Sequence, residues 1–247
     1  MLPTSSAVGR KGLDTSTFLG YTSTDTGESV SWGLEGLVND FGIGTMAAKL
    51  AKDPATPTSR RAQLTEESAY FLERATHYGT LFNPKVGFFQ GRAADGTFPS
   101  SFDPEDWGGD YTETNAWNFA FHAPFDGNGL ANLYGGRDAL AKKLDTFFAT
   151  PETATKPGGY GGVIHEMLEA RDVRMGQLGQ SNQVSHHIAY MYDWTGQQWK
   201  TAEKVREIMR RLYVGSEIGQ GYPGDEDNGE MSAWYVLSSL GIYPLQV

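Results

Sequence analysis

Apolar residues recur at helical spacing along most of this chain, and no series of alternating apolar and polar residues separates them. The period is clearest in residues 61–78, where Leu64, Phe71 and Ala75 follow it. Helices are expected over residues 29–52, 61–78, 114–123, 136–148, 184–194, 201–213 and 230–240. Helical segments without intervening strands predict an all-α fold built from paired helices.

Long loops connect these segments, and residues 81–111 have almost no helical period. A loop of this length inside a compact domain is usually functional or disordered, and this one carries too many aromatic side chains for a disordered segment. We therefore expect loops at one end of the helical scaffold to build a site. Residues 1–20, rich in Ser, Thr and Gly, are expected to form a flexible lead-in to a helical domain over residues 21–247.

The composition excludes several classes of protein. The chain has 247 residues, of which 39% are hydrophobic, so it can bury a sizeable core. It carries a net charge of -10 and no Lys/Arg-rich tract, so nucleic acid is not an expected partner. The absence of cysteine excludes disulfides and thiolate nucleophiles. No run of about 18 apolar residues predicts a membrane span, and the first residues lack the apolar core of a signal peptide.

Glu113 is a candidate general acid because it precedes a helix start with large aromatic side chains nearby, in "DYTETNAWNF". A carboxyl group flanked by aromatic rings loses hydration, which raises its pKa and keeps a proton available for donation. Trp117 offers a flat ring of the kind that stacks on sugars. The alternative is that Glu113 only favours a helix N-terminus through the helix dipole.

Four carboxylates crowd the stretch "PGDEDNGEMSAWYV" at another loop-to-helix junction. In an extended segment Asp225 and Asp227 point the same way and Glu226 points to the opposite side. One aspartate could then activate water while the other orients it. The alternative is acidic capping of the helix that begins near Glu230. An EF-hand is excluded, because the loop lacks the spacing and the terminal Glu of that motif.

The stretch "HEMLE", residues 165–169, resembles the signature of zinc peptidases but ends in Glu where the second His is required, which disfavours that class. Hard oxygen ligands from Glu166, Glu169, Asn182 and Asp227 would suit calcium better than zinc.

The stretch "SNQVSHH", residues 181–187, adds amide oxygens and two imidazoles before an aromatic helix, although either histidine could simply cap or pack. Neither the Gly-x-Ser-x-Gly elbow of serine hydrolases nor a P-loop is present.

Several long blocks occur in one order that resembles glycoside hydrolase family 92, the calcium-dependent exo-acting α-mannosidases, from about Tyr21 to the C-terminus. The blocks are "SVSWGLEGLVNDFGIGTMAAKL", "LFNPKVGFFQGRAADGTFPSSFDP", "YTETNAWNF", "IHEMLE", "MGQ", "SNQVSHHIAYMYDWTGQQWKTAEKVREIM" and "GDEDNGEMSAWYVLSSLGIYP". An ordered series of this kind is far more specific than any single motif.

The resemblance implies an (α/α)6 barrel that hydrolyses α-linked mannose with inversion. Glu113 falls where the family has its general acid, and Asp227 where it has its general base, with Asp225 as a partner carboxylate. An inverting glycosidase needs an acid for the departing oxygen and a base for water on the opposite face, with the carboxyl groups about 6.5–9.5 Å apart.

Further site residues follow from the same resemblance. His165 and Glu166 fall on the His-Glu pair that resembles the leaving-sugar subsite of members preferring α-1,2 linkages. The residues implied near the calcium and the mannose are Asn182, Gln183 and His187, with Val184 in place of the usual proline. The implied metal ligands are Glu169, Asn182 and Asp227.

Members of the family are much longer and include an N-terminal β-sandwich domain and earlier barrel helices. The chain is therefore expected to form an incomplete barrel that carries the acid, the base and part of the metal site. The family is usually exported, so a secreted or periplasmic location is expected, with mannose-containing glycans as partners. Two alternatives are a non-catalytic mannose-binding module and another (α/α) barrel glycosidase, such as a trehalase or glucoamylase relative.

Overall fold

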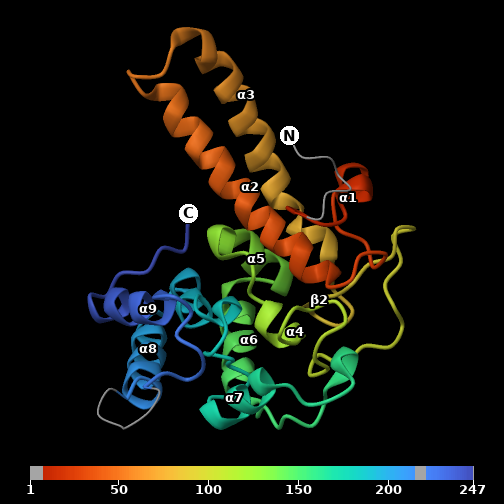
Figure 1. Ribbon diagram of the computed structural model, residues 1–247, viewed down its shortest axis with the longest axis vertical. Coiled ribbons are helices and arrows are strands. Elements are labelled where there is room, and N and C mark those ends of the chain that lie inside the picture. The colour runs from red at the N-terminus through yellow and green to blue at the C-terminus, as the bar shows by residue number, and fades with distance from the viewer. Residues whose placement is uncertain (1–7, 215–220, 247) are drawn as a thin grey trace.

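The computed structural model describes residues 8–214 and 221–246. As predicted, this part of the chain is mostly helical (Figure 1). The α-helices are α1 (Leu13–Leu19), α2 (Ser29–Lys52), α3 (Thr58–Ala75), α4 (Ala116–Phe119), α5 (Gly127–Tyr134), α6 (Arg137–Ala149), α7 (His165–Val173), α8 (Gln198–Leu212) and α9 (Glu230–Ser239). The 3-10 helices are η1 (Thr76–Leu81), η2 (Pro124–Asp126), η3 (Gly158–Tyr160), η4 (Gln183–Ser185) and η5 (Ile188–Thr195). None of these helices is long and apolar enough to cross a membrane.

The α2–α3 pair forms a helical hairpin that projects from the rest of the molecule (Figure 1). The helices pack closely at Gly44, where a Cβ atom would lie 2.8 Å from Leu72 Cγ. Asp40 of α2 is fully buried and accepts hydrogen bonds from Arg10 with both carboxylate oxygens, and its Oδ2 also pairs with Arg74 of α3 at 3.2 Å. These ion pairs tie the segment before α1 to the hairpin, so the expected lead-in, residues 1–20, includes a helix and a tertiary contact.

The predicted helices differ from the observed ones mainly where the chain is buried on all sides. Residues 114–123 form only the short α4, which ends at Phe119 and is followed by a turn. Residues 184–194 form 3-10 rather than α-helical turns, with hydrogen bonds such as Tyr190 N–H to the His187 carbonyl oxygen. Neither α5 nor α7 was predicted.

The long loop of residues 81–111 contains a short β-hairpin, which was not predicted because its residues do not alternate between apolar and polar. Strands β1 (Phe82–Asn83) and β2 (Phe88–Phe89) pair antiparallel, with Phe82 opposite Phe89. Both phenylalanines are buried. The aromatic residues of this loop therefore belong to the hydrophobic core, which confirms that the loop is ordered.

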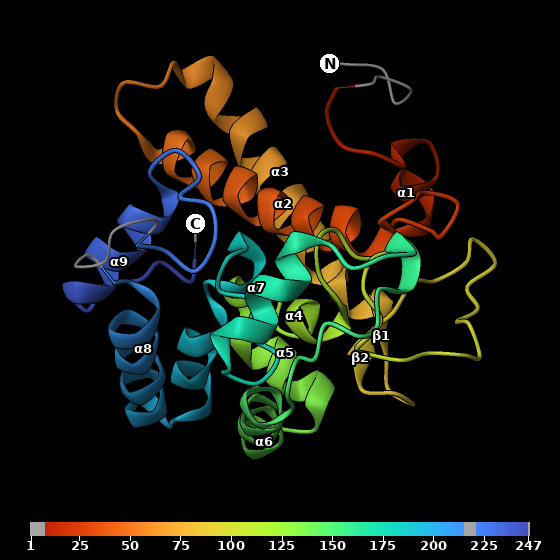
Figure 2. The ribbon, with the colours of Figure 1, turned by 60° about the horizontal axis from the view of Figure 1, so that its bottom comes forward.

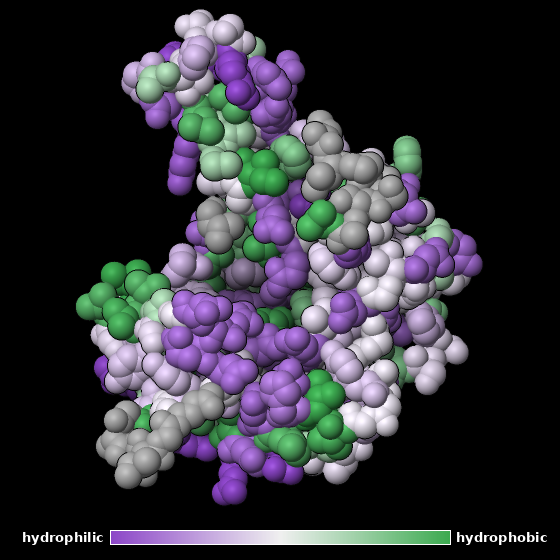
Figure 3. Space-filling view, viewed as in Figure 1, coloured by the Kyte–Doolittle hydropathy of each residue, from purple (hydrophilic) through white to green (hydrophobic). Residues whose placement is uncertain are grey.

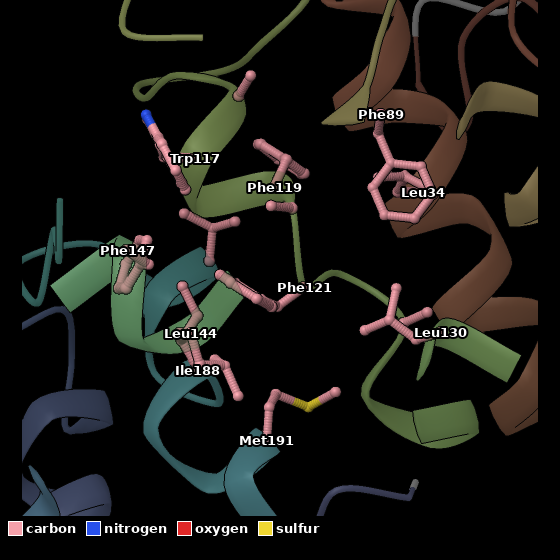
Figure 4. Close-up of a cluster of buried hydrophobic side chains, with 14 of the residues drawn as sticks. Leu34, Phe89, Trp117, Phe119, Phe121, Leu130, Leu144, Phe147, Ile188 and Met191 are labelled. Carbon is pink, nitrogen blue, oxygen red and sulfur yellow. The ribbon is translucent and has the colours of Figure 1, made fainter. Parts of the chain in front are cut away.

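The core lies where α4, α6 and η5 meet the lower end of α2 (Figure 4). Its labelled side chains are Leu34, Phe89, Trp117, Phe119, Phe121, Leu130, Leu144, Phe147, Ile188 and Met191. A separate small hydrophobic cluster contains Met167 and Ala170 of α7 together with Trp107 and Ala154. These two clusters support the loops that carry the candidate site residues.

Exposed apolar residues lie at the end of α9 and just after it. Val236 of α9 is exposed by 56%, and Leu240 and Ile242, which follow the helix, by 67% and 57%. In the space-filling view, apolar residues gather over α9, and hydrophilic residues gather in the hollow between α9 and the projecting hairpin (Figure 3).

Candidate active site

Glu113 lies near the end of a short loop whose two ends are joined. Trp107 and Asn115 form an isolated antiparallel bridge, and the Gly108 N–H donates to the Thr114 carbonyl oxygen at 3.0 Å. Asn115 then caps α4 with its side chain. The loop is therefore fixed at its base by backbone pairing and at its exit by a helix start.

The backbone of Glu113 is in the left-handed region, with a φ of 51°, which costs energy for a residue other than glycine. Its N–H donates to the Tyr160 hydroxyl oxygen at 2.5 Å, and its Oε2 accepts a hydrogen bond from Asn182 Nδ2 at 3.0 Å. The side chain is exposed. The expected enclosure by aromatic rings is not observed, because Trp117 packs into the core instead.

Asp227 also has left-handed backbone, with a φ of 57°, and Asn228 and Gly229 continue it at 57° and 103°. Asp and Asn tolerate this region better than most residues. The Asp227 side chain is exposed, and its Oδ2 accepts a hydrogen bond from Gln183 Nε2 at 2.5 Å. Its second carboxylate oxygen can therefore contact water or a ligand.

The other acids of the same stretch hold the start of α9. Glu226 accepts hydrogen bonds from the N–H groups of Gly229, at 2.6 Å, and Ser232, at 3.1 Å. The hydrogen bonds from Ser232 and Gly229 lower the pKa of Glu226. Glu230 is the first residue of α9, as predicted, and its Oε1 lies 2.7 Å from His186 Nδ1. Helix capping therefore occupies Glu226, which leaves Asp227 for the site.

Two consecutive amides contact the candidate acid and the candidate base. Asn182 donates to Glu113, and Gln183 donates to Asp227. The backbone of Asn182 is extended, with φ of -125° and ψ of 139°. Gln183 is the first residue of the 3-10 helix η4, so the chain changes direction between the two amides. The two carboxylates therefore contact side chains of two residues that are joined by one peptide unit.

Helix α7 places a second group of polar side chains near the acidic loop (Figures 1 and 2). The two ring nitrogens of His165 lie 3.1 Å from Glu166 Oε1 and 3.1 Å from Glu169 Oε1. The hydrogen bond with Glu169 and the charges of Glu166 and Asp225 raise the pKa of His165. The loop approaches α7 so closely that a Cβ atom on Gly224 would lie 3.0 Å from Glu169 Oε2.

Two candidate site residues lie in the core rather than beside these groups. Trp117 is buried, with its ring edge-on to Phe88 at 4.7 Å. Lys143 Nζ lies 4.4 Å from the Trp117 ring, and burial lowers the pKa of that lysine to about 7. His187 is also buried; its Nε2 lies 2.9 Å from the Phe121 carbonyl oxygen, and burial lowers its pKa to about 3. A neutral His187 therefore donates this hydrogen bond as a packed core residue.

The implied metal ligands do not form a calcium site on their own. In the part of the chain that the structure describes, no three His, Asp or Glu side chains are grouped so that they could hold a metal ion. Glu169 Oε1 contacts His165, and Asp227 Oδ2 accepts from Gln183. Since calcium takes six to eight oxygen ligands, these residues could supply only part of its coordination.

Sequence reasoning missed Tyr160 and Glu152. Tyr160 accepts from the Glu113 N–H, and burial and the charges of Glu28 and Glu113 raise its pKa. Its position in the glycine-rich stretch "PGGYGG" was the available signal. Glu152 is a buried carboxylate that contacts the base of the Glu113 loop, and nothing in the local sequence distinguishes it from a surface acid.

Two carboxyl groups on one helical scaffold are what a glycoside hydrolase that works with an acid and a base requires. The model of the glycosyl hydrolase family 92 catalytic domain matches residues 2–247. The chain therefore belongs to this family of α-mannosidases, and its helices form part of the family's (α/α)6 barrel. The family is typically calcium-dependent and acts on mannosylated glycans.

Solved structures and a curated relative agree with this membership. A family GH92 inverting mannosidase from Bacteroides thetaiotaomicron is 35% identical, with a TM-score of 0.75 over 97% of this chain and 30% of its own. An α-mannosidase of the same family and species, bound to mannoimidazole, is 28% identical, with a TM-score of 0.78 over 94% of this chain and 29% of its own.

An uncharacterized secreted glycosidase from Arthroderma benhamiae is 23% identical over 98% of this chain and 30% of its own length. The chain thus spans about 30% of the length of the relatives that it matches.

Proposed function

We propose that this protein is an inverting, calcium-dependent exo-α-mannosidase that removes terminal α-linked mannose from glycans. The observation that carries the proposal is the pair of consecutive amides, Asn182 and Gln183, each donating to one candidate catalytic carboxylate. The 35% identity to an inverting mannosidase supports both the sugar and the stereochemistry.

Glu113 acts as the general acid and Asp227 as the general base. Because Glu113 Oε2 accepts from Asn182, its proton resides on Oε1, from which it passes to the glycosidic oxygen as the bond to the anomeric carbon breaks. Because Asp227 Oδ2 accepts from Gln183, its Oδ1 takes a proton from the water that attacks the opposite face. Carboxyl groups about 6.5–9.5 Å apart leave room for this water, and separation by one peptide unit favours that arrangement.

The leaving sugar contacts α7. His165 is exposed and its partner Glu166 is partly buried, and together they can exchange hydrogen bonds with sugar hydroxyls, which favours α-1,2-linked mannose as the substrate. Asp225 faces the same helix and adds negative charge near His165. In this role Asp225 orients the substrate or water beside Asp227 rather than acting as the base.

Calcium and export complete the proposal. Glu169, Asn182 and Asp227 would supply part of the oxygen ligands of a bound calcium ion, which would hold and polarise the sugar hydroxyls. The relative named as a secreted glycosidase supports export of this protein as well.

The test is turnover of nitrophenyl α-mannoside and α-1,2-mannobiose by the full-length protein, with calcium and with chelator. We expect release of β-mannose as the first anomer in an NMR time course, and loss of activity with chelator. Glu113→Gln and Asp227→Asn should each lower kcat by about 10²- to 10⁴-fold.

Glu67→Gln on the projecting hairpin, whose side chain contacts only Gln63 at the surface, is the matched control and should keep full activity. Release of α-mannose first would contradict inversion. Mannose binding without release of free sugar would indicate a binding module, and cleavage of glucosides would indicate another barrel glycosidase.

A further inference from the structure

A buried carboxylate, Glu152, lies behind the loop that carries Glu113. Its Oε2 accepts hydrogen bonds from Trp107 Nε1 at 3.1 Å and from Asn115 Nδ2 at 3.4 Å. Its Oε1 accepts from the N–H groups of Thr153 at 2.9 Å and Ala154 at 2.7 Å. Four neutral donors thus satisfy one carboxylate that is only 9% exposed.

The two side-chain donors come from the two ends of the Glu113 loop. Trp107 and Asn115 are the residues that form the bridge at its base. The segment after Glu152 adds backbone contacts to the same end, because the Trp107 N–H donates to the Lys156 carbonyl oxygen at 3.1 Å and Gly159 N–H donates to the Trp107 carbonyl oxygen at 2.7 Å. Glu152 therefore fixes both ends of the loop to one rigid segment.

Glu113 requires such support. Its left-handed backbone is unfavourable for a side chain of this size and persists only where the surroundings fix it. The contacts of Glu113 itself, to Tyr160 and Asn182, are made at the surface. The buried part of the support comes from the Trp107–Asn115 base and its acceptor Glu152.

We propose that Glu152 is a positioning residue for the general acid, which rests on the proposed function of Glu113. Glu152 does not contact substrate. It holds Trp107 and Asn115 in the register that keeps the Glu113 carboxyl group aimed at the glycosidic oxygen.

The substitution Glu152→Gln separates this role from general stabilisation. A glutamine side chain has only one oxygen that can accept hydrogen bonds, and its NH2 group is a donor. That NH2 group would face either Trp107 and Asn115 or the N–H groups of Thr153 and Ala154, so one of these pairs loses its acceptor. The loop base therefore loosens while the side chain keeps its volume. Misplacement of Glu113 should then slow hydrolysis most for the substrates whose leaving group needs a proton.

The experiment compares kcat in the full-length protein for dinitrophenyl α-mannoside, whose leaving group needs little protonation, and for α-1,2-mannobiose, whose leaving group needs full protonation. We expect Glu152→Gln to lose about 10- to 100-fold more on mannobiose than on the dinitrophenyl substrate, with little change in KM. Glu113→Gln should show the same pattern more strongly.

Two further variants keep the test decisive. Trp107→Phe removes the indole donor together with part of the buried ring, and it should show the same selective loss even if Glu152→Gln folds poorly. Asp40→Asn weakens a buried carboxylate contact outside the loop and should lower both rates by one common factor.

Equal losses on both substrates for Glu152→Gln and Trp107→Phe would overturn the inference. Absence of turnover by the unmodified protein, or a Glu113→Gln variant without leaving-group dependence, would overturn the proposed function and this inference with it.

Discussion

Glu113 and Asp227 share a left-handed backbone and an exposed carboxyl group, but their surroundings differ. Behind Glu113 lies a buried polar network in which Asn115 contacts Glu152 and Gln177. Asp227 lies in a surface loop that is held by hydrogen bonds at the start of α9 and by exposed contacts such as the one from Gln183. The comparison indicates that the strained glutamate is supported by a buried network, whereas the aspartate, which tolerates the same conformation better, is supported by contacts at the surface.

The two regions should also respond differently to mutation. Removing one member of a buried network leaves other members without partners, and each buried unsatisfied group carries a desolvation cost. Removing one member of a surface loop exposes its partners to water, which replaces most of the lost hydrogen bond. Three predictions test this difference, from the largest expected effect to the smallest.

Asn115→Ala should lower the free energy of unfolding by about 2 to 4 kcal/mol, because α4 loses its cap and the buried Gln177 amide oxygen loses its donor. Urea denaturation of the variant and the unmodified protein measures this difference. Asn128→Ala, at an exposed asparagine that contacts only Arg137, is the control and should change stability by less than about 0.5 kcal/mol. A loss below about 1 kcal/mol for Asn115→Ala would argue against a cooperative network.

The paired substitutions Asn182→Asp and Gln183→Glu should move opposite limbs of the pH–rate profile by about 0.5 to 1 unit. A negative charge beside Glu113 raises the pKa of the acid, so activity persists to higher pH and the alkaline limb moves upward. A negative charge beside Asp227 raises the pKa of the base, so activity is lost earlier on acidification and the acidic limb moves upward. If both variants moved the same limb, the assignment of acid and base to these two amides would be wrong.

Glu226→Ala should lower the denaturation midpoint only slightly, since its hydrogen bonds to Gly229 and Ser232 cap α9 at the surface. The folded state lowers the pKa of Glu226, so the carboxylate stabilises the fold above its unfolded pKa of about 4.3. The difference from the unmodified protein should therefore be full at neutral pH and vanish as the pH falls through the lowered pKa. A difference that persisted in acid would show that the charge is not responsible.

The sequence predicted the long helices best, because their buried faces follow the helical period. α2 begins and ends at the predicted residues, 29 and 52. The helix α5 was missed because Gly127 and Gly129 are poor helix formers. Glycine is needed at both positions, because Trp194 lies too close to Gly127, and Tyr78 too close to Gly129, for a side chain to fit. Such close contacts between distant segments leave no periodic signal in the sequence.

The sequence proposed the charged residues of the candidate site but not their arrangement. Glu113 was proposed from its place before an aromatic helix start, Asp227 from crowded carboxylates, and both from resemblance to the family. Their contacts with Asn182 and Gln183 join residues that lie far apart in the chain, so only the tertiary fold brings them together. Trp117 was predicted to bind sugar, but it packs in the hydrophobic core. Aromatic side chains occur both in hydrophobic cores and in sugar-binding sites, and the sequence does not distinguish the two.

Asn182 and Gln183 share one peptide unit, so displacements of the candidate acid and the candidate base should be correlated rather than independent. A small rotation of this unit would change both contacts together. One segment would then align both carboxyl groups, and residues 178–183 should tolerate insertions less well than the loops that carry Glu113 and Asp227.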